Sequence, residues 1–179
     1  MLVKKRETIE EWAFTVAYIL FAFKLYNRDV SNPEVFYWIT GLAKYGALLV
    51  LTIGICFSEF KKRQIAWIGV IFALDIFVML KSGVMTFVII TLLAILGTKI
   101  ENKTIFKVAF FTLFSFLVIT LLLCRFGIYQ DHITNRYVGT NNRHSLGFYH
   151  SNVLPLVFSY IVGYYCIFKS KVKESTCIY

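Results

Sequence analysis

Six long apolar runs, separated by short polar segments, restrict the fold of this chain more than any other sequence feature. They cover residues 12–26, 35–57, 65–80, 84–97, 105–129 and 152–168. A membrane core of about 30 Å is crossed by about 20 helical residues, so runs of this kind are typical of membrane-spanning helices. The apolar fraction is 58%, whereas a soluble domain is about half apolar. The sequence therefore predicts an all-α, polytopic transmembrane helix bundle of about six spans.

The third and fourth runs are short, and Lys81-Ser82-Gly83 between them admits two interpretations. Either the tripeptide is a tight turn between two short spans, or the two runs form one long, broken helix. Basic residues decide between these alternatives, because cytoplasmic segments of membrane proteins are rich in lysine and arginine. The turn gives twelve basic residues inside against five outside, whereas one long helix gives nine against seven.

The favoured orientation places both termini in the cytoplasm. Its inner basic residues are Lys4, Lys5, Arg6, Lys61, Lys62, Arg63, Lys99, Lys103, Lys107, Lys169, Lys171 and Lys173. Its outer basic residues are Arg28, Lys81, Arg125, Arg136 and Arg143. The net charge of +9 is thus explained by membrane orientation, and nucleic acid is not an expected partner. We expect one transmembrane domain, residues 1–179, with residues 130–151 as an outer polar loop.

This outer loop and the start of the last run are the segment best suited to chemistry. Cations and amides concentrate there: Arg136, Arg143, His144, His150, Asn135, Asn141, Asn142 and Asn152. Guanidinium and imidazolium groups suit a phosphate ligand. Ser151 or Asn152 can cap the last helix, and Pro155 is tolerated in its first turn. The N-terminus of a helix offers free N–H groups to an anion, although a plain solvated connector is the alternative.

Residues 143–152, Arg-His-Ser-Leu-Gly-Phe-Tyr-His-Ser-Asn, resemble the R-x-S-L-G-F-x-H-P-N signature of Wzy-type oligosaccharide repeat-unit polymerases, the O-antigen and capsular polysaccharide polymerase family. Ser151 stands where the signature has proline, a benign change because serine can cap a helix that proline would begin. The resemblance covers nearly all of this chain but only the N-terminal part of the family architecture. Family members have further spans and another large outer loop with functional arginines, so we expect a truncated or partner-dependent chain.

The resemblance implies polymerisation of oligosaccharide repeat units linked to undecaprenyl diphosphate, a glycosyltransferase-type reaction. Arg143 and His150 are then the expected catalytic residues, for the leaving diphosphate and the acceptor proton, and His144 is the alternative proton acceptor. The expected substrate-binding residues are Arg136, His144, Asn152 and Arg125. Asp131 is the only carboxylate in the loop, so neither a metal nor another cofactor is expected.

The same resemblance implies the bacterial cytoplasmic membrane as location, with a flippase and a chain-length regulator as further partners. Two other functions compete with the polymerase. One is a non-catalytic membrane protein that binds a lipid-linked glycan or assists a polysaccharide assembly complex. The other, a transporter fragment, is weaker because no broken helix pair or inverted repeat is visible.

Lys44 and Asp75 are ionisable residues well inside apolar runs, where a charge is costly and is a functional candidate by default. At about 1.5 Å of rise per residue, their expected depths differ by roughly 5 Å. We therefore expect an ion pair between adjacent helices. A polar lining for a lipid-linked substrate is the alternative.

Overall fold

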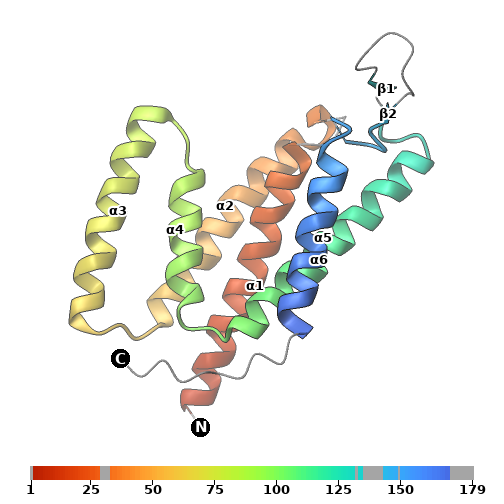
Figure 1. Cartoon of the computed structure of the whole chain (residues 1–179). Helices are drawn as coiled ribbons and strands as arrows, with labels where there is room; N and C mark the ends of the chain where they lie inside the picture. Colours follow the sequence, from red (N-terminus) through yellow and green to blue (C-terminus); the bar gives the residue numbers. More distant parts are fainter. Residues whose placement is uncertain (1, 29–32, 132, 135–142, 149, 170–179) are drawn as a thin grey trace. The chain divides into compact units, whose positions relative to one another are not determined.

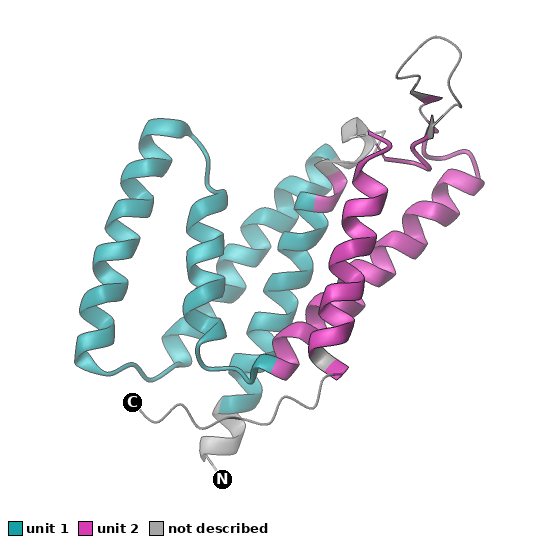
Figure 2. Ribbon diagram, in the orientation of Figure 1, with its two compact units in different colours: residues 1–25, 37–102 teal, residues 26–36, 103–179 magenta. Residues whose placement is uncertain are grey.

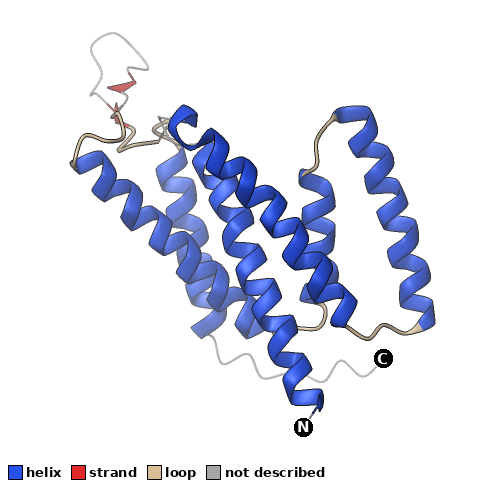
Figure 3. Cartoon of the chain, turned by 180° about the vertical axis from the view of Figure 1, so that it is seen from behind, coloured by secondary structure: helices blue, strands red, loops and turns tan. Residues whose placement is uncertain are grey.

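Helices make up almost all of the regular structure (Figures 1 and 3). The computed structural model describes residues 2–28, 33–131, 133–134, 143–148 and 150–169, without the side chains of residues 2–6, 28, 33–36, 134, 143 and 168. The helices of this part are α1 (Leu2–Arg28), α2 (Pro33–Phe57), α3 (Lys62–Ser82), α4 (Thr86–Gly97), α5 (Asn102–Arg125) and α6 (Val153–Lys169). A two-residue pairing of β1 (Ile133–Thr134) with β2 (Arg143–His144) is the only addition there. The predicted all-α fold is confirmed.

Three of the described helices are long and apolar enough to cross a membrane: residues 37–57, 62–82 and 102–125. Two further apolar helices are shorter, at residues 86–97 and 153–167. Helix α1 is long, with 27 residues, but Glu7, Glu10 and Glu11 lie in its first half. The chain is therefore a helical membrane protein by composition, while six spans and their sidedness remain a prediction.

Sidedness is tested directly by two modifications of the chain. A reporter fused at Ser175 is expected to lie in the cytoplasm, and a cysteine replacing Thr140 should react with an impermeant thiol reagent from outside. Both positions lie outside the described residues. An external reporter signal at Ser175 would invert the orientation derived from the basic residues.

The turn between the third and fourth runs is confirmed. Helix α3 ends at Ser82, and Gly83 adopts a left-handed conformation with φ +68°, its N–H donating to Met79 O at 2.8 Å. Glycine reaches this conformation without a Cβ clash. Helix α4 then begins at Thr86 and packs along α3. In contrast, α1 begins well before residue 12, because an apolar run marks the buried part of a helix and not its end.

The backbone divides into two compact units, coloured separately in Figure 2. Unit 1 contains residues 1–25 and 37–102, and unit 2 contains residues 26–36 and 103–179. The sequence predicted a single domain, and composition gave no sign of this division, since both units consist of the same kind of apolar helix. Each unit is described separately below.

Small residues allow close helix packing in unit 1. Ala13 and Ala17 of α1 and Ala47 of α2 are fully buried. Gly54 of α2 is the tightest point, because a Cβ built there would lie 2.8 Å from Ala13 Cβ and 3.0 Å from a methyl carbon of Leu96. Membrane helices associate through such small-residue contacts, since lipid supplies no hydrophobic driving force between them.

Gly54→Ala is expected to destabilise unit 1 by about 1–3 kcal/mol, the usual cost of overpacking a tight contact. Gly69→Ala in α3 is the matched control, because a Cβ there meets nothing within 4 Å. The control should be neutral or stabilising by up to about 1 kcal/mol, since alanine favours a helix more than glycine does. Unfolding by SDS titration in mixed micelles gives both values, and equal effects would contradict the tight contact.

Candidate functional site

The polar loop predicted at residues 130–151 follows the end of α5 in unit 2. Gly127 has φ +74°, its N–H donates to Cys124 O at 3.0 Å, and the N–H of Ile128 donates to Leu123 O at 2.9 Å. This hydrogen-bond pair is the Schellman motif, which ends a helix at a left-handed residue. The chain therefore leaves the helix at a defined angle and buries Tyr129, which is 5% exposed.

The short sheet brings the two ends of the loop together. Strands β1 and β2 are antiparallel, with Ile133 opposite His144 and Thr134 opposite Arg143. Residues 135–142 between them lie outside the described residues. The pairing places Asp131, just before β1, beside the residues that follow β2.

Asp131 is the centre of the described hydrogen bonds in the loop. Its Oδ2 lies 2.6 Å from Nδ1 of His144, and its Oδ1 accepts from Leu146 N at 2.8 Å. The hydroxyl of Ser145 also donates to Oδ1, at 3.3 Å. Desolvation alone would raise the pKa of Asp131, but the hydrogen bonds from His144 and Leu146 and the charge of His144 outweigh it, so the pKa lies below its ordinary value. The carboxylate is therefore ionised at neutral pH.

A tight turn follows at residues 145–148. Phe148 N donates to Ser145 O at 3.1 Å, and the two central residues have positive φ, +49° at Leu146 and +91° at Gly147. This combination is characteristic of a type I′ turn. A left-handed leucine is strained and is retained only where its surroundings impose it. Here the hydrogen bond from Leu146 N to Asp131 stabilises that conformation.

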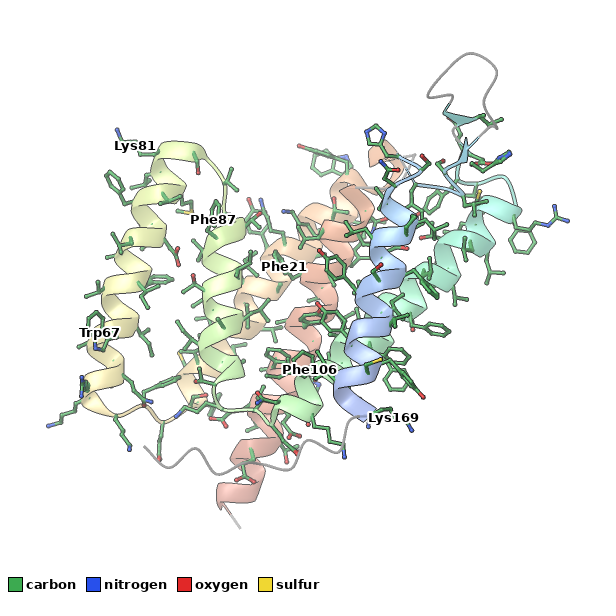
Figure 4. All side chains as sticks on the ribbon, in the orientation of Figure 1. Phe21, Trp67, Lys81, Phe87, Phe106 and Lys169 are labelled. Atoms are coloured by element: carbon green, nitrogen blue, oxygen red, sulfur yellow. The ribbon has the colours of Figure 1, made fainter. Side chains whose placement is uncertain are left out.

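Phe148 fixes the turn to the helices of unit 2. Its side chain is fully buried in a cluster with Tyr26, Leu117, Tyr129, Val157 and Ile161. The ring of Tyr26 lies 5.6 Å away in an edge-on arrangement, a favourable geometry for two aromatic rings. Farther along the same helices, the ring of Phe106 in α5 (labelled in Figure 4) lies 6.0 Å from that of Tyr164 in α6. The Ser-Leu-Gly-Phe part of the motif is therefore a packing element.

The structure places the predicted site residues at several points of unit 2. His144 is paired with Asp131, and its side chain is 54% exposed. His150 and Asn152 are exposed just before α6, and Arg125 is exposed at the end of α5. The backbone of Arg143 lies in β2, whereas its side chain and the whole of Arg136 lie outside the described residues. Helix α6 begins at Val153 with Pro155 in its first turn, as expected.

The predicted ion pair between Lys44 and Asp75 is absent from the described residues. Lys44 Nζ lies 4.4 Å from the ring centre of Tyr45. Asp75 Oδ2 is buried with no hydrogen-bond partner among the described atoms. The expectation was wrong because similar depth does not make two helices neighbours: α3, which carries Asp75, packs along α4.

The chemical capacity of the site follows from the Asp131–His144 contact. A carboxylate only accepts, so Nδ1 of His144 carries the proton in this contact. In its neutral form the ring has its lone pair on Nε2, which can accept a proton from a bound hydroxyl group. Sequence reasoning treated Asp131 only as a lone carboxylate and missed this orienting role. Within the described residues, no group of three or more His, Cys, Asp or Glu side chains could hold a metal ion.

Comparison with known proteins identifies no relative of this chain. No protein-family model matches the chain, and neither a curated protein nor a solved structure is significantly similar to it.

Proposed function

We propose that this membrane protein polymerises oligosaccharide repeat units carried on undecaprenyl diphosphate, alone or with a partner chain, as Wzy-type polymerases do. One observation supports the proposal most: Asp131 orients an exposed imidazole, His144, directly before the turn that the buried Phe148 anchors. A proton acceptor at a fixed position in a water-exposed loop is what activation of a sugar hydroxyl requires.

In the proposed reaction, Nε2 of His144 takes the proton of the acceptor hydroxyl. The acceptor oxygen forms a bond to the anomeric carbon of the donor glycan, while the bond from that carbon to the diphosphate oxygen breaks. The diphosphate leaves with the electron pair, and Arg143 and Arg136 stabilise its charge. Of the two histidines expected as proton acceptor, we assign this role to His144 because Asp131 orients its ring. His150 and Asn152 contact the sugar or phosphate.

Arg143→Lys should weaken binding of an undecaprenyl diphosphate glycan by about 1–3 kcal/mol, because lysine cannot make a two-pronged contact with phosphate oxygens. The measurement is the dissociation constant of the purified chain in matched detergent, for wild type, Arg143→Lys, Arg143→Ala and His150→Ala. Wild-type affinity in Arg143→Ala and His150→Ala would leave the loop as a solvated connector.

The alternative function, a non-catalytic glycan-binding membrane protein, shares the lipid ligand but not the proton transfer. His144→Gln separates the two. A polymerase would lose polymer formation in a polymerase-deficient strain complemented by this chain, while its lipid affinity changes little. A binding protein would restore no polymer in that strain, with or without His144.

A further inference from the structure

One side of α5 in unit 2 is apolar and exposed up to its last turn. Phe111, Val118 and Leu122 are 51%, 39% and 51% exposed, and their spacing along the helix places them on the same side. The other side packs against Phe148 and α6. Because α5 is apolar enough to cross a membrane, its exposed side is the surface available to lipid.

This apolar surface continues beyond the end of α5. Phe126 N donates to Leu122 O at 2.9 Å, so Phe126 lies one helical turn beyond Leu122, on the exposed side of α5. Phe126 is 75% exposed and Ile128 is 53% exposed. Apolar surface left exposed in this way marks a contact with a membrane or with another protein. Its continuity with the exposed side of α5 favours the membrane.

The turn at residues 145–148 lies beside the last turn of α5 and not beyond it. A Cβ built at Gly147 would lie 3.1 Å from Cys124 Cβ and 3.2 Å from Thr120 Cγ2, and Phe148 packs farther in, with Leu117. Leu122, at the level of Gly147, is exposed on the side of α5 available to lipid. The turn therefore returns the chain to a depth at which α5 is still an apolar membrane helix.

Leu146 is exposed at this depth. Its side chain is 39% exposed, and its φ of +49° is a left-handed conformation. The central positions of a type I′ turn favour glycine, asparagine and aspartate, and an exposed leucine side chain gains nothing from water. Transfer of that side chain from water to lipid is favourable. An apolar environment around the turn therefore explains leucine at this position.

We propose that Phe126, Ile128 and Leu146 insert into the lipid bilayer at the boundary between headgroups and acyl chains. The partner is the bilayer surface itself, and zwitterionic phospholipid suffices, because the inserted side chains carry no charge. Asp131 and His144, which are joined to each other and to the turn by hydrogen bonds, are then held in the hydrated headgroup layer. A substrate of His144 would carry its reacting group at that level, as a membrane-anchored molecule does. The proposal goes beyond the polymerase function and does not rest on it.

Single tryptophans measure the depth of these positions in the full chain. Trp12, Trp38 and Trp67 are replaced by phenylalanine, and either Phe126→Trp or Leu146→Trp is added. Fluorescence is measured in phosphatidylcholine vesicles with bromine near the headgroup end or near the methyl end of the acyl chains, and in parallel with acrylamide in the water. Both reporters should be quenched more strongly by bromine near the headgroup end, which corresponds to a depth of about 5–10 Å in the interface.

Gln130→Trp is the matched control, because Gln130 is an exposed polar residue of the same loop. Its tryptophan should be quenched by acrylamide and little by brominated lipid. Acrylamide quenching at positions 126 and 146 as strong as at position 130 would overturn the proposal. The same result is expected if a partner protein covers these residues in the cell, because the vesicles contain only the purified chain. Lipid quenching at position 126 alone would also overturn it, since the membrane contact would then be confined to the end of α5.

A second measurement needs no reporter at Leu146 and covers the case in which Leu146→Trp opens the turn. The methyl NMR signals of Leu146, assigned with Leu146→Met, should be broadened by a nitroxide at the upper end of the lipid acyl chain and not by a soluble gadolinium chelate. The opposite pattern would place Leu146 in water and contradict the insertion. Neither readout is an activity, so the outcome is separate from that of the polymerase tests.

Discussion

Replacing Gly147 with alanine is expected to destabilise the closed form of the loop, in which the turn at residues 145–148 packs against α5, by about 2–4 kcal/mol. The same change at Gly127 should cost only about 1–2 kcal/mol. Both glycines have positive φ, +91° at Gly147 and +74° at Gly127, so both variants incur the strain of a left-handed alanine. Only Gly147 is also crowded. A Cβ there would lie 3.1 Å from Cys124 Cβ and 3.2 Å from Thr120 Cγ2, whereas a Cβ at Gly127 meets nothing within 4 Å.

Cys124 is a suitable probe for this prediction because it lies directly beneath Gly147. With Cys56, Cys166 and Cys177 replaced by serine, the rate of Cys124 labelling by a thiol reagent reports opening of the loop. Gly147→Ala should raise this rate by about 30-fold or more, and Gly127→Ala by about 5- to 30-fold. Equal rates in the two variants would show that the backbone conformation alone, without the contact to α5, determines loop stability.

The helices were predictable because their signal is local and repeated. For five of the six apolar runs, both boundaries lie within four residues of those of the corresponding helix, and Gly83 marked the turn between two of the helices. The start of α1 was not predictable from the same signal. Its first turns are charged, and an apolar pattern predicts which part of a helix is buried but not where the helix begins.

The site was only partly predictable because its main contact is not local. Asp131 and His144 are 13 residues apart, and they meet only because β1 pairs with β2 and the chain returns to α5 through Phe148. No periodicity marks such a contact. The sequence identified the cations, but it predicted no turn at Leu146 and Gly147 and no buried contact for Phe148.

The largest expected effect on the candidate chemistry comes from Asp131. Asp131→Ala should open the loop, because Leu146 N and Ser145 Oγ lose their shared acceptor and the positive φ of Leu146 loses this stabilising hydrogen bond. Hydrogen bonds to an ionised group contribute about 1.5–3 kcal/mol each. We therefore expect a loss of about 2–4 kcal/mol in loop closure, measured by faster hydrogen exchange of the amides of Leu146 and Phe148.

The same carboxylate makes loop closure pH-dependent. The pKa of Asp131 is lower in the closed loop than its ordinary value, so the open loop binds more protons and closure is favoured as the pH rises. The contribution is complete above the ordinary aspartate value of about 3.9 and is lost as the pH falls through the lower pKa of the closed loop. The protection factors of the loop amides in wild type, which correct for the intrinsic exchange rate at each pH, should therefore fall below about pH 4, while Asp131→Ala should lack this step.

Asp131→Asn separates orientation of His144 from loop closure. The amide oxygen can still accept from Leu146 N, so the loop should remain closed. The amide nitrogen, however, only donates, and it would face Nδ1 of His144. The imidazole should therefore switch tautomer, with its proton on Nε2, where it can no longer accept one from a hydroxyl.

Ring ¹⁵N chemical shifts of His144 test this switch without any assay of activity. The chain has three histidines, so single His→Gln variants assign the signals. Wild type should show protonated Nδ1 and Asp131→Asn protonated Nε2, with amide exchange in the loop nearly unchanged. In the proposed polymerase, this variant should lose about 10²–10⁴-fold in rate, the usual contribution of a general base. Because the tautomer and the rate should change together, an Asp131→Asn chain with Nε2 protonated and full polymerase activity would exclude His144 as the proton acceptor.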